Sequence, residues 1–335
     1  MAGTVLITGG AGYIGSHVLC LLAESGYDVV AYDNLSTGRP EAVLAGELVV
    51  GDLADTAVVE KLLSSRRFDS VLHFAASISV PESIADPAAY YANNTANTLG
   101  LLRCCIDARV ANFVFSSTAA VYGEPESGIA SESSRLVPIN PYGRSKLMSE
   151  WILADMAAAS DLRYVVLRYF NAAGADSKGR IGQSYPGATH LIKVACEAAT
   201  GKRGSVTVFG TDYPTPDGTG IRDYIHVEDL AAAHLDALRH LERGGESCTL
   251  NCGYGRGFSV REVLECVKAC SGVDFAVVEG PRRAGDPARL VADSARIRDV
   301  LGWAPRHDRL EEIVRSALQW ERKLSEPSER RHEAR

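Results

Sequence analysis

The sequence predicts an α/β fold built on a doubly wound parallel sheet, followed by a smaller mixed α/β region. Two observations predict this architecture. Short runs rich in β-branched residues alternate with helical patterns through the first half, as in proteins whose parallel strands are joined by right-handed crossovers. After about Gly174 the alternation gives way to stretches rich in glycine, serine and proline, which are typical of loops. We therefore expect a first domain over residues 1–173, a second mainly over 174–323, and a charged tail at 324–335.

The elements of the first half follow one another in regular order. Residues 5–8 have the continuous apolar pattern of a buried strand, and residues 14–25 have that of a helix closed by Gly26. Further strands are predicted at 29–32, 48–51, 70–74, 113–117 and 164–168, and further helices at 56–64, 91–108 and 142–158.

The second half has longer loops, at 174–187 and 213–220. Helices are predicted near 189–200, 227–241, 259–271 and 310–323. Within 206–251 we expect the chain to return to the first sheet, with strands around 206–209 and 248–251.

The composition excludes several classes of function. The 335 residues are 46% hydrophobic and 23% charged, close to the averages for globular proteins. There are 35 basic and 42 acidic residues, a net charge of −7, and no basic run, so we expect no binding to nucleic acid or membrane. No apolar run reaches the ~18 residues of a membrane helix, and the chain start lacks a secretory signal pattern. We expect a cytoplasmic protein.

The eight cysteines and eight histidines form no familiar motif. No cysteine pair has CxxC spacing, and a chain of this size can bury a core without bridges. Reduced core thiols are therefore expected. The histidines lack HExxH and His-x-His spacing, so no metal site is expected.

A glycine-rich turn separates the first predicted strand from the first helix. The segment TGGAGYIG satisfies GxGxxG through Gly10, Gly12 and Gly15. Glycines there let the backbone approach a pyrophosphate, and the helix N-terminus offers it N–H groups. Asp33, at the end of the second strand, fits an acid that binds the ribose of NAD and repels the 2′-phosphate of NADP. The alternative is that Asp33 only caps the following loop. This context predicts a Rossmann-type NAD site.

Polar residues also end the third and fourth strands. Asp52 fits a contact to the adenine, or an ordinary helix start. His73 lies at the sheet edge where ligands bind in such folds, but we expect it to be packed in the core.

Tyr142 and Lys146 form a candidate proton-transfer pair. They are four residues apart at the start of a predicted helix, so both lie on one helical face. An ammonium close to a phenol favours the phenolate, so we expect a depressed tyrosine pKa. The hydroxyl of Thr118, at the end of the fifth strand, would bridge the substrate oxygen and the phenol. The alternative for a YxxxK match alone is an exposed helix pair.

Together these segments resemble the extended short-chain dehydrogenase/reductase superfamily, through TGGAGYIG, Asp33, FSSTAAVYG and PYGRSK. The segments LRYFNAAGA, VFGTDYPTPDGTGIRDYIHVEDLA and PRRAGDPARLVAD make the chain similar to the UDP-glucose 4-epimerase family, from about Val5 to Trp303. The resemblance implies interconversion of UDP-galactose and UDP-glucose. Tyr142 would take the proton of the 4-hydroxyl while C4 gives hydride to NAD, and the 4-keto sugar would turn over before hydride returns. Lys146 would bind the nicotinamide ribose and tune Tyr142.

The resemblance also implies individual contacts. Those to the cofactor are Gly9, Gly12, Tyr13, Ile14, Gly15, Asp33, Asn34, Asp52, Leu53, Phe74, Ala75, Ala76, Asn93, Ser116, Tyr142, Lys146 and Tyr169. Those to the UDP-sugar are Thr118, Tyr142, Asn171, His190, Leu191, Arg222, Tyr224, Arg283, Asp286 and Leu290. Arginines suit a diphosphate because they donate bidentate, charge-assisted hydrogen bonds. The alternative for them is an ion pair with Asp223 or Asp286.

Three positions depart from the family pattern. Ile78 stands where some members carry a cofactor-contacting lysine, and His190 where an asparagine often meets the diphosphate. Leu290 stands where some members have a bulky tyrosine beside the 2-substituent of the sugar. We hypothesise that this chain tolerates UDP-N-acetylhexosamines.

The sequence bears on several other functions. A 4,6-dehydratase needs a carboxylic acid pair after the strand-end threonine, whereas Thr118 is followed by Ala119 and Ala120. A 4-epimerase of another UDP-sugar (a uronic acid or pentose) and a non-epimerising nucleotide-sugar oxidoreductase stay open. A non-catalytic dinucleotide sensor would have no reason to keep Tyr142, Lys146 and the arginines together.

The resemblance also implies a homodimer. The two helices expected at 91–108 and 142–158 carry apolar residues that could pair between copies, namely Leu99, Leu102, Ile106, Leu147, Ile152 and Met156. The alternative is that these residues pack against their own sheet.

Overall fold

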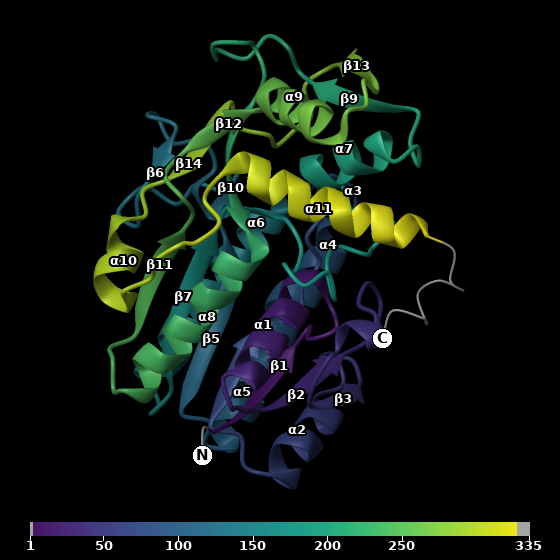
Figure 1. Cartoon of the computed structure of the whole chain (residues 1–335). Coiled ribbons are helices and arrows are strands. Elements are labelled where there is room, and N and C mark those ends of the chain that lie inside the picture. Colours follow the sequence, from purple (N-terminus) through teal and green to yellow (C-terminus); the bar gives the residue numbers. More distant parts are fainter. Residues whose placement is uncertain (1–2, 327–335) are drawn as a thin grey trace.

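A seven-stranded parallel sheet organises the larger part of the protein (Figure 1). The structure is a computed structural model that describes residues 3–326. The strand order is β11-β7-β5-β4-β1-β2-β3, so the winding reverses between β1 and β4, and ligands bind at such a switch point. The strands are β1 (Thr4–Thr8), β2 (Asp28–Asp33), β3 (Glu47–Val50), β4 (Ser70–His73), β5 (Asn112–Thr118), β7 (Arg163–Tyr169) and β11 (Cys248–Cys252).

Helices cover both faces of this sheet. One face packs against α1 (Tyr13–Glu24) and α8 (Val227–Glu242), with α10 (Ala295–Leu301) beside β11. The other packs against α2 (Thr56–Ser65), α5 (Asn97–Asp107) and α6 (Pro141–Ala158). Short helical turns at Pro40–Ala42, Val80–Ala85, Pro87–Tyr90, Tyr91–Ala96 and Ala119–Tyr122 complete this part.

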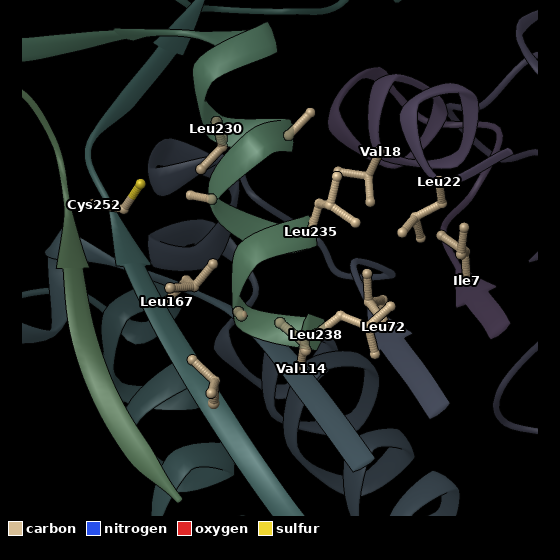
Figure 2. Close-up of a cluster of buried hydrophobic side chains, with 14 of the residues drawn as sticks. Ile7, Val18, Leu22, Leu72, Val114, Leu167, Leu230, Leu235, Leu238 and Cys252 are labelled. Carbon is tan, nitrogen blue, oxygen red and sulfur yellow. The ribbon is translucent and has the colours of Figure 1, made fainter. Parts of the chain in front are cut away.

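The core between α8, α1 and the sheet is mainly aliphatic. Leu230, Leu235 and Leu238 extend from α8 toward the strands and α1 (Figure 2). They meet Val18 of α1 and Leu167 of β7, among other fully buried side chains. Burial of one such side chain stabilises the fold by about 1.5–3 kcal/mol, so this packing fixes the strands whose ends form the site.

A second part lies beyond the carboxyl ends of the strands. Its central strand β10 pairs with β8, β12 and β14, and β14 pairs with β6. A separate two-stranded sheet contains β9 and β13, and helices α7, α9 and α11 pack on one another. These elements are β6 (Ile129–Ala130), β8 (Asn171–Ala173), β9 (Ser205–Phe209), β10 (Ile221–His226), β12 (Gly257–Ser259), β13 (Ala276–Gly280), β14 (Arg289–Ala292), α7 (Leu191–Ala199), α9 (Val260–Ser271) and α11 (Leu310–Ser325).

The α/β class and the doubly wound sheet are confirmed. The chain does return to this sheet at 248–252 as β11, but the predicted return at 206–209 is wrong. That segment forms β9, whose partner is β13, because an apolar strand pattern does not specify which edge it joins. The helix α10 was not predicted. The boundary at Gly174 stays a prediction.

Two further expectations concern the chain end and the thiols. The tail predicted at 324–335 begins later, because α11 continues to Ser325, and residues 327–335 lie outside the described residues. All eight cysteines carry free thiols, and five of them are buried. The prediction of core thiols is wrong for Cys248, Cys266 and Cys270, which are half-buried. Among residues 3–326, no helix combines the length and the apolar character needed to cross a bilayer.

Candidate active site

A cavity of about 860 Å³ opens at the carboxyl ends of the parallel strands, between the two parts of the molecule. It brings together most of the residues singled out in the sequence. Its lining includes Gly9, Gly12, Tyr13, Ile14, Gly15, Asp33, Asn34, Asp52, Leu53, Phe74, Ala75, Ala76, Asn93, Thr118, Tyr142, Tyr169, Asn171, His190, Leu191, Arg222, Tyr224, Arg283, Asp286 and Leu290. Ser116 and Lys146 are buried and do not belong to this lining.

The glycine turn forms a cradle that only glycine permits. Gly9 has a φ of +72°, and a Cβ at Gly15 would lie 2.1 Å from the Gly9 carbonyl oxygen. Gly12 is the N-cap of α1 and contributes no side-chain cap. The first N–H groups of α1 are therefore free of capping side chains and suit an anionic diphosphate.

Asp33 caps the loop that follows β2, which was the alternative to ribose binding. Its carboxylate accepts hydrogen bonds from the N–H of Ala11 at 2.9 Å and of Leu35 at 2.8 Å. It thus caps the following loop and also holds the glycine turn. Each carboxylate oxygen has a second lone pair, so ribose hydroxyls can still bind. Together with the cradle, this acid fits NAD.

Asp52 and His73 lie where the sequence predicted. Asn34 donates to Asp52 at 2.8 Å, and the Ala54 N–H and Asn34 lower the pKa of this exposed carboxyl. His73 is buried between Thr8 at 2.7 Å and Thr98 at 2.9 Å. Burial lowers its pKa to about 3, which confirms a packed, neutral core histidine.

Tyr142 begins α6 at the cavity wall. Pro141 occupies the first turn, and the Asn140 side chain accepts from the Gly143 N–H at 2.8 Å, which fixes where the helix starts. The prediction of a depressed tyrosine pKa is wrong for this structure: burial raises the pKa of Tyr142, and a hydrogen bond with Thr118 opposes the rise. Thr118 is therefore correctly placed beside the phenol.

Lys146, one helical turn beyond Tyr142 on α6, is buried as well. Its side chain is 3% exposed, and its Nζ lies 4.2 Å from the centre of the Phe115 ring. Burial lowers the pKa of Lys146 to about 7, and Glu150 opposes that shift. The rise in the pKa of Tyr142 comes from its own burial, with a further contribution from Tyr169.

The predicted UDP-binding arginines line the far end of the cavity. Arg222 donates to its neighbour's carbonyl, Ile221, at 2.9 Å. It does not pair with Asp223, whose carboxylate binds the N–H groups of Tyr254 and Gly255. Arg283 does pair with Asp286, at 3.1 Å between Nε and Oδ2, and stacks over the Phe209 ring at 4.4 Å.

Three departures from the family pattern also lie in the lining. Ile78 is 51% exposed there. His190 is the N-cap of α7, and burial lowers its pKa, so its ring is neutral. Leu290 is 7% exposed and packs in an apolar cluster with Tyr122 and Phe170.

Sequence reasoning missed two groups of residues. Arg203, Val206, Phe209 and Tyr213 line the cavity through β9 and its flanks, although Phe209 and Tyr213 fall within the segment VFGTDYPTPDGTGIRDYIHVEDLA. A buried pair, Glu150 and Arg168, lies close to Lys146. Glu150 could have been found by its spacing, since it is four residues beyond Lys146 on the same helical face.

One three-residue group of potential metal ligands occurs among residues 3–326. It consists of His226, Glu228 and His307. Both ring nitrogens of His226 are already engaged, with the Glu228 N–H at 3.1 Å and with Ser316 at 3.0 Å. This group lies outside the cavity lining.

Comparison with known proteins gives consistent matches. The model of the NAD dependent epimerase/dehydratase family matches residues 5–253. A UDP-glucose 4-epimerase of Azospirillum brasilense is 58% identical over 323 residues, 96% of this chain and 93% of that protein. The crystal structure of UDP-glucose 4-epimerase from Brucella ovis in complex with NAD has a TM-score of 0.91 at 48% identity, covering 95% of this chain and 98% of that one. The UDP-Glc/GlcNAc 4-epimerase of Campylobacter jejuni has a TM-score of 0.84 at 50% identity, covering 96% of this chain and 100% of that one.

Proposed function

The chain belongs to the NAD dependent epimerase/dehydratase family, and we propose that it interconverts UDP-galactose and UDP-glucose. A single observation carries this proposal. One cavity contains the glycine turn, the Thr118–Tyr142 pair and the arginines Arg222 and Arg283. A nucleotide-sugar oxidation site needs all three, and relatives at up to 58% identity are UDP-glucose 4-epimerases.

The cofactor end is built by the glycine turn and Asp33. The N–H groups of α1 would hold the pyrophosphate, and Asp33, which holds the turn through Ala11, would bind the adenosine ribose. A bound nicotinamide would supply the acceptor and donor of hydride for the sugar carbon C4, and its positive charge would favour the phenolate form of Tyr142.

The chain's own residues handle the proton and the substrate. Thr118 and Tyr142 share a hydrogen bond, so the 4-hydroxyl can lose its proton to the phenolic oxygen and regain it there. Burial raises the pKa of Tyr142, so the phenolate, once formed, is a strong base for the proton of the 4-hydroxyl. Arg222 and Arg283 hold the diphosphate by charge-assisted hydrogen bonds, while the 4-keto sugar turns over in the pocket.

Leu290 favours a second substrate class, the UDP-N-acetylhexosamines. It presents a small aliphatic wall to the cavity, which leaves room for an acetamido group beside C2. The Campylobacter jejuni relative is a UDP-Glc/GlcNAc 4-epimerase, which supports this extension of the substrate range.

Proton NMR of the purified protein with UDP-galactose and no added cofactor tests the main proposal. We expect the anomeric signal of UDP-glucose to grow to an equilibrium mixture. A flat spectrum, still flat after NAD addition, would contradict the proposal and direct the assay to uronic acid and pentose substrates. Net reduction of added NAD would instead identify a non-epimerising oxidoreductase.

The oligomeric state and the compartment belong to the same proposal. We propose a homodimer formed by α5 and α6, whose exposed apolar side chains are Leu99, Met148 and Trp151. Leu102 and Leu147 were also candidates, but they are buried within the protomer. Eight free thiols support a reducing compartment such as the cytoplasm, which cell fractionation tests.

A further inference from the structure

We propose that Glu150 is a positioning residue for the proton transfer. Its buried carboxylate holds the ends of β5 and β7 against α6 and places a negative charge one helical turn beyond Lys146. The inference rests on the proposed function, since it concerns how the same site works. Tyr142, Lys146 and Glu150 succeed one another at intervals of four along α6, and therefore share one helical face.

The contacts of Glu150 are made with the two strands next to the catalytic pair. Arg168 Nε donates to both carboxylate oxygens at 3.1 Å, and Arg168 Nη2 donates to Oε2 at 2.6 Å. Ser117 Oγ donates to Oε1. In the sheet, Ser117 is opposite Arg168, and Thr118 is opposite Tyr169. The carboxylate thus binds the two residues that precede the cavity-lining pair Thr118 and Tyr169.

The Arg168 side chain continues this network toward the second part of the molecule. Its Nη1 donates to the Tyr122 hydroxyl at 3.0 Å, which donates to Asn251 Oδ1 at 2.6 Å. Asn251 Nδ2 donates to the Ala130 carbonyl at 2.8 Å. Ala130 lies on β6, the neighbour of β14, which carries Leu290. The network therefore joins the proton-transfer strand to the strand that bounds the sugar.

Among the charged groups near Lys146, Glu150 is the carboxylate that favours its protonated form. Burial lowers the pKa of Lys146 to about 7, and Glu150 is the charge that opposes this shift. His73 on β4 is neutral, because burial lowers its pKa to about 3. The nearby phenols are neutral because burial raises their pKa values: Tyr90, Tyr122, Tyr142 and Tyr169. Arg168 is the second cation, held by Glu150 itself.

A variant that removes the charge of Glu150 but keeps the shape of its side chain tests the proposal directly. In Glu150→Gln, assayed as the full chain with its NAD, we expect kcat to fall about 10- to 100-fold. The KM for UDP-galactose should change little. The alkaline limb of the kcat–pH profile should move down by about one pH unit, because an ammonium without its counter-charge loses its proton at lower pH. Glu150→Asp keeps the charge and should restore the limb, with kcat still reduced.

A matched control is available in the second part. Glu321 is a carboxylate 1% exposed that pairs with Lys193 and Lys202, each at 2.5 Å. Glu321→Gln removes an equally buried ionic partner and should lower thermal stability without moving the pH profile. If Glu150→Gln behaves like this control, with wild-type kcat and profile, the carboxylate is only structural and the inference is wrong.

A second readout separates this inference from the proposed function. NMR of carbon-13-labelled lysine, with Lys146 assigned by Lys146→Met, follows the ammonium directly. Its titration should move down by about one unit in Glu150→Gln even if the wild-type protein fails to epimerise UDP-galactose. An inactive wild-type protein would contradict the proposed function, and an unmoved Lys146 titration would contradict the role of Glu150.

Discussion

The phenolic hydroxyl of Tyr13 donates a hydrogen bond to the carbonyl oxygen of Gly174 at 2.7 Å, across 161 residues of sequence. Tyr13 begins α1 directly after the glycine turn, and Gly174 follows β8, where the chain enters the second part. Burial raises the pKa of Tyr13, so the donor stays protonated at all working pH values. The cofactor turn and the substrate part are therefore tied by one buried bond.

Tyr13→Phe should loosen this tie. The ring keeps its edge contact with His17 at 5.4 Å, but the buried Gly174 carbonyl loses its donor, at a cost of about 1–3 kcal/mol of unfolding free energy. We expect a lower melting temperature and faster loss of NAD on dialysis. Unchanged values of both would mean that this bond contributes nothing to stability or cofactor retention.

Tyr142→Phe should abolish epimerisation while NAD stays bound. The phenyl ring keeps its edge contact with Tyr90 at 6.5 Å, so the fold is preserved, whereas the proton acceptor is gone. We expect kcat to fall by about 10²–10⁴-fold. The proton NMR assay measures the rate, and absorbance of the released nucleotide measures occupancy. A variant with wild-type turnover would remove Tyr142 from the mechanism.

Leu290→Tyr should narrow the substrate range. A phenol ring in place of a leucine that is 7% exposed fills the space beside the 2-substituent. We expect the ratio of UDP-N-acetylglucosamine to UDP-glucose turnover to fall at least about tenfold, which corresponds to about 1.4 kcal/mol. Leu290→Met conserves volume and should leave the ratio near the wild-type value. An unchanged ratio in the tyrosine variant would contradict the hypothesis.

Acid should destabilise the protein through its buried histidines. Burial lowers the pKa of His73 and His226 to about 3 and of His17 and His234 to about 4. An unfolded histidine titrates near 6.5, so these groups stabilise the fold fully above that pH and lose the effect as pH falls toward 4 and 3. Between pH 6.5 and its folded pKa, each of these histidines lowers the free energy of unfolding by about 1.4 kcal/mol for every pH unit of acidification.

Burial raises the pKa of Asp223 to about 6, so protonation of Asp223 increases the free energy of unfolding as pH falls. This single carboxyl opposes the effect of four histidines. Urea unfolding at pH 7 and pH 5 checks the sum. We expect the unfolding free energy to be smaller at pH 5. Equal values at the two pH values would mean that the buried histidines accept protons without cost.

The dimer proposal is tested at Trp151. Its side chain is 56% exposed on α6, beside the α5 surface that carries Leu99. Trp151→Glu places charge at the centre of the proposed interface, and light scattering after gel filtration should then report a monomer. Val278→Glu, at a similarly exposed valine (50%) on β13, should leave the mass unchanged. A Trp151→Glu protein with the wild-type mass would place the interface elsewhere, or exclude one.

Local sequence patterns predict the cofactor end of the site well, because its chemistry is local. Gly15 and Asp33 act through backbone geometry within one strand–turn–helix unit, and their spacing is visible in the sequence. The environment of Tyr142 could not be predicted in this way. The direction of its pKa shift depends on how deeply α6 is buried, which is set by contacts with distant elements.

The sequence also did not indicate which strands and side chains pair when they are far apart along the chain. The strand pattern of β9 was recognised, but its partner β13 begins 67 residues after the end of β9, at Ala276. Glu150 and Arg168 meet only because α6 packs over β5 and β7. Such contacts form only in the folded protein, whereas the motifs are already visible in the sequence.

The position of β11 at the edge of the large sheet sets an order of events during synthesis. Its parallel partner β7 ends at Tyr169, yet β11 begins only at Cys248. Residues 170–247 must leave the ribosome before this edge can close, so the nascent first half exposes unpaired backbone along β7. Open edges of this kind recruit other chains. A fragment that stops at residue 173 should therefore aggregate, and an expressible version of the cofactor half must carry α8 and β11 with it.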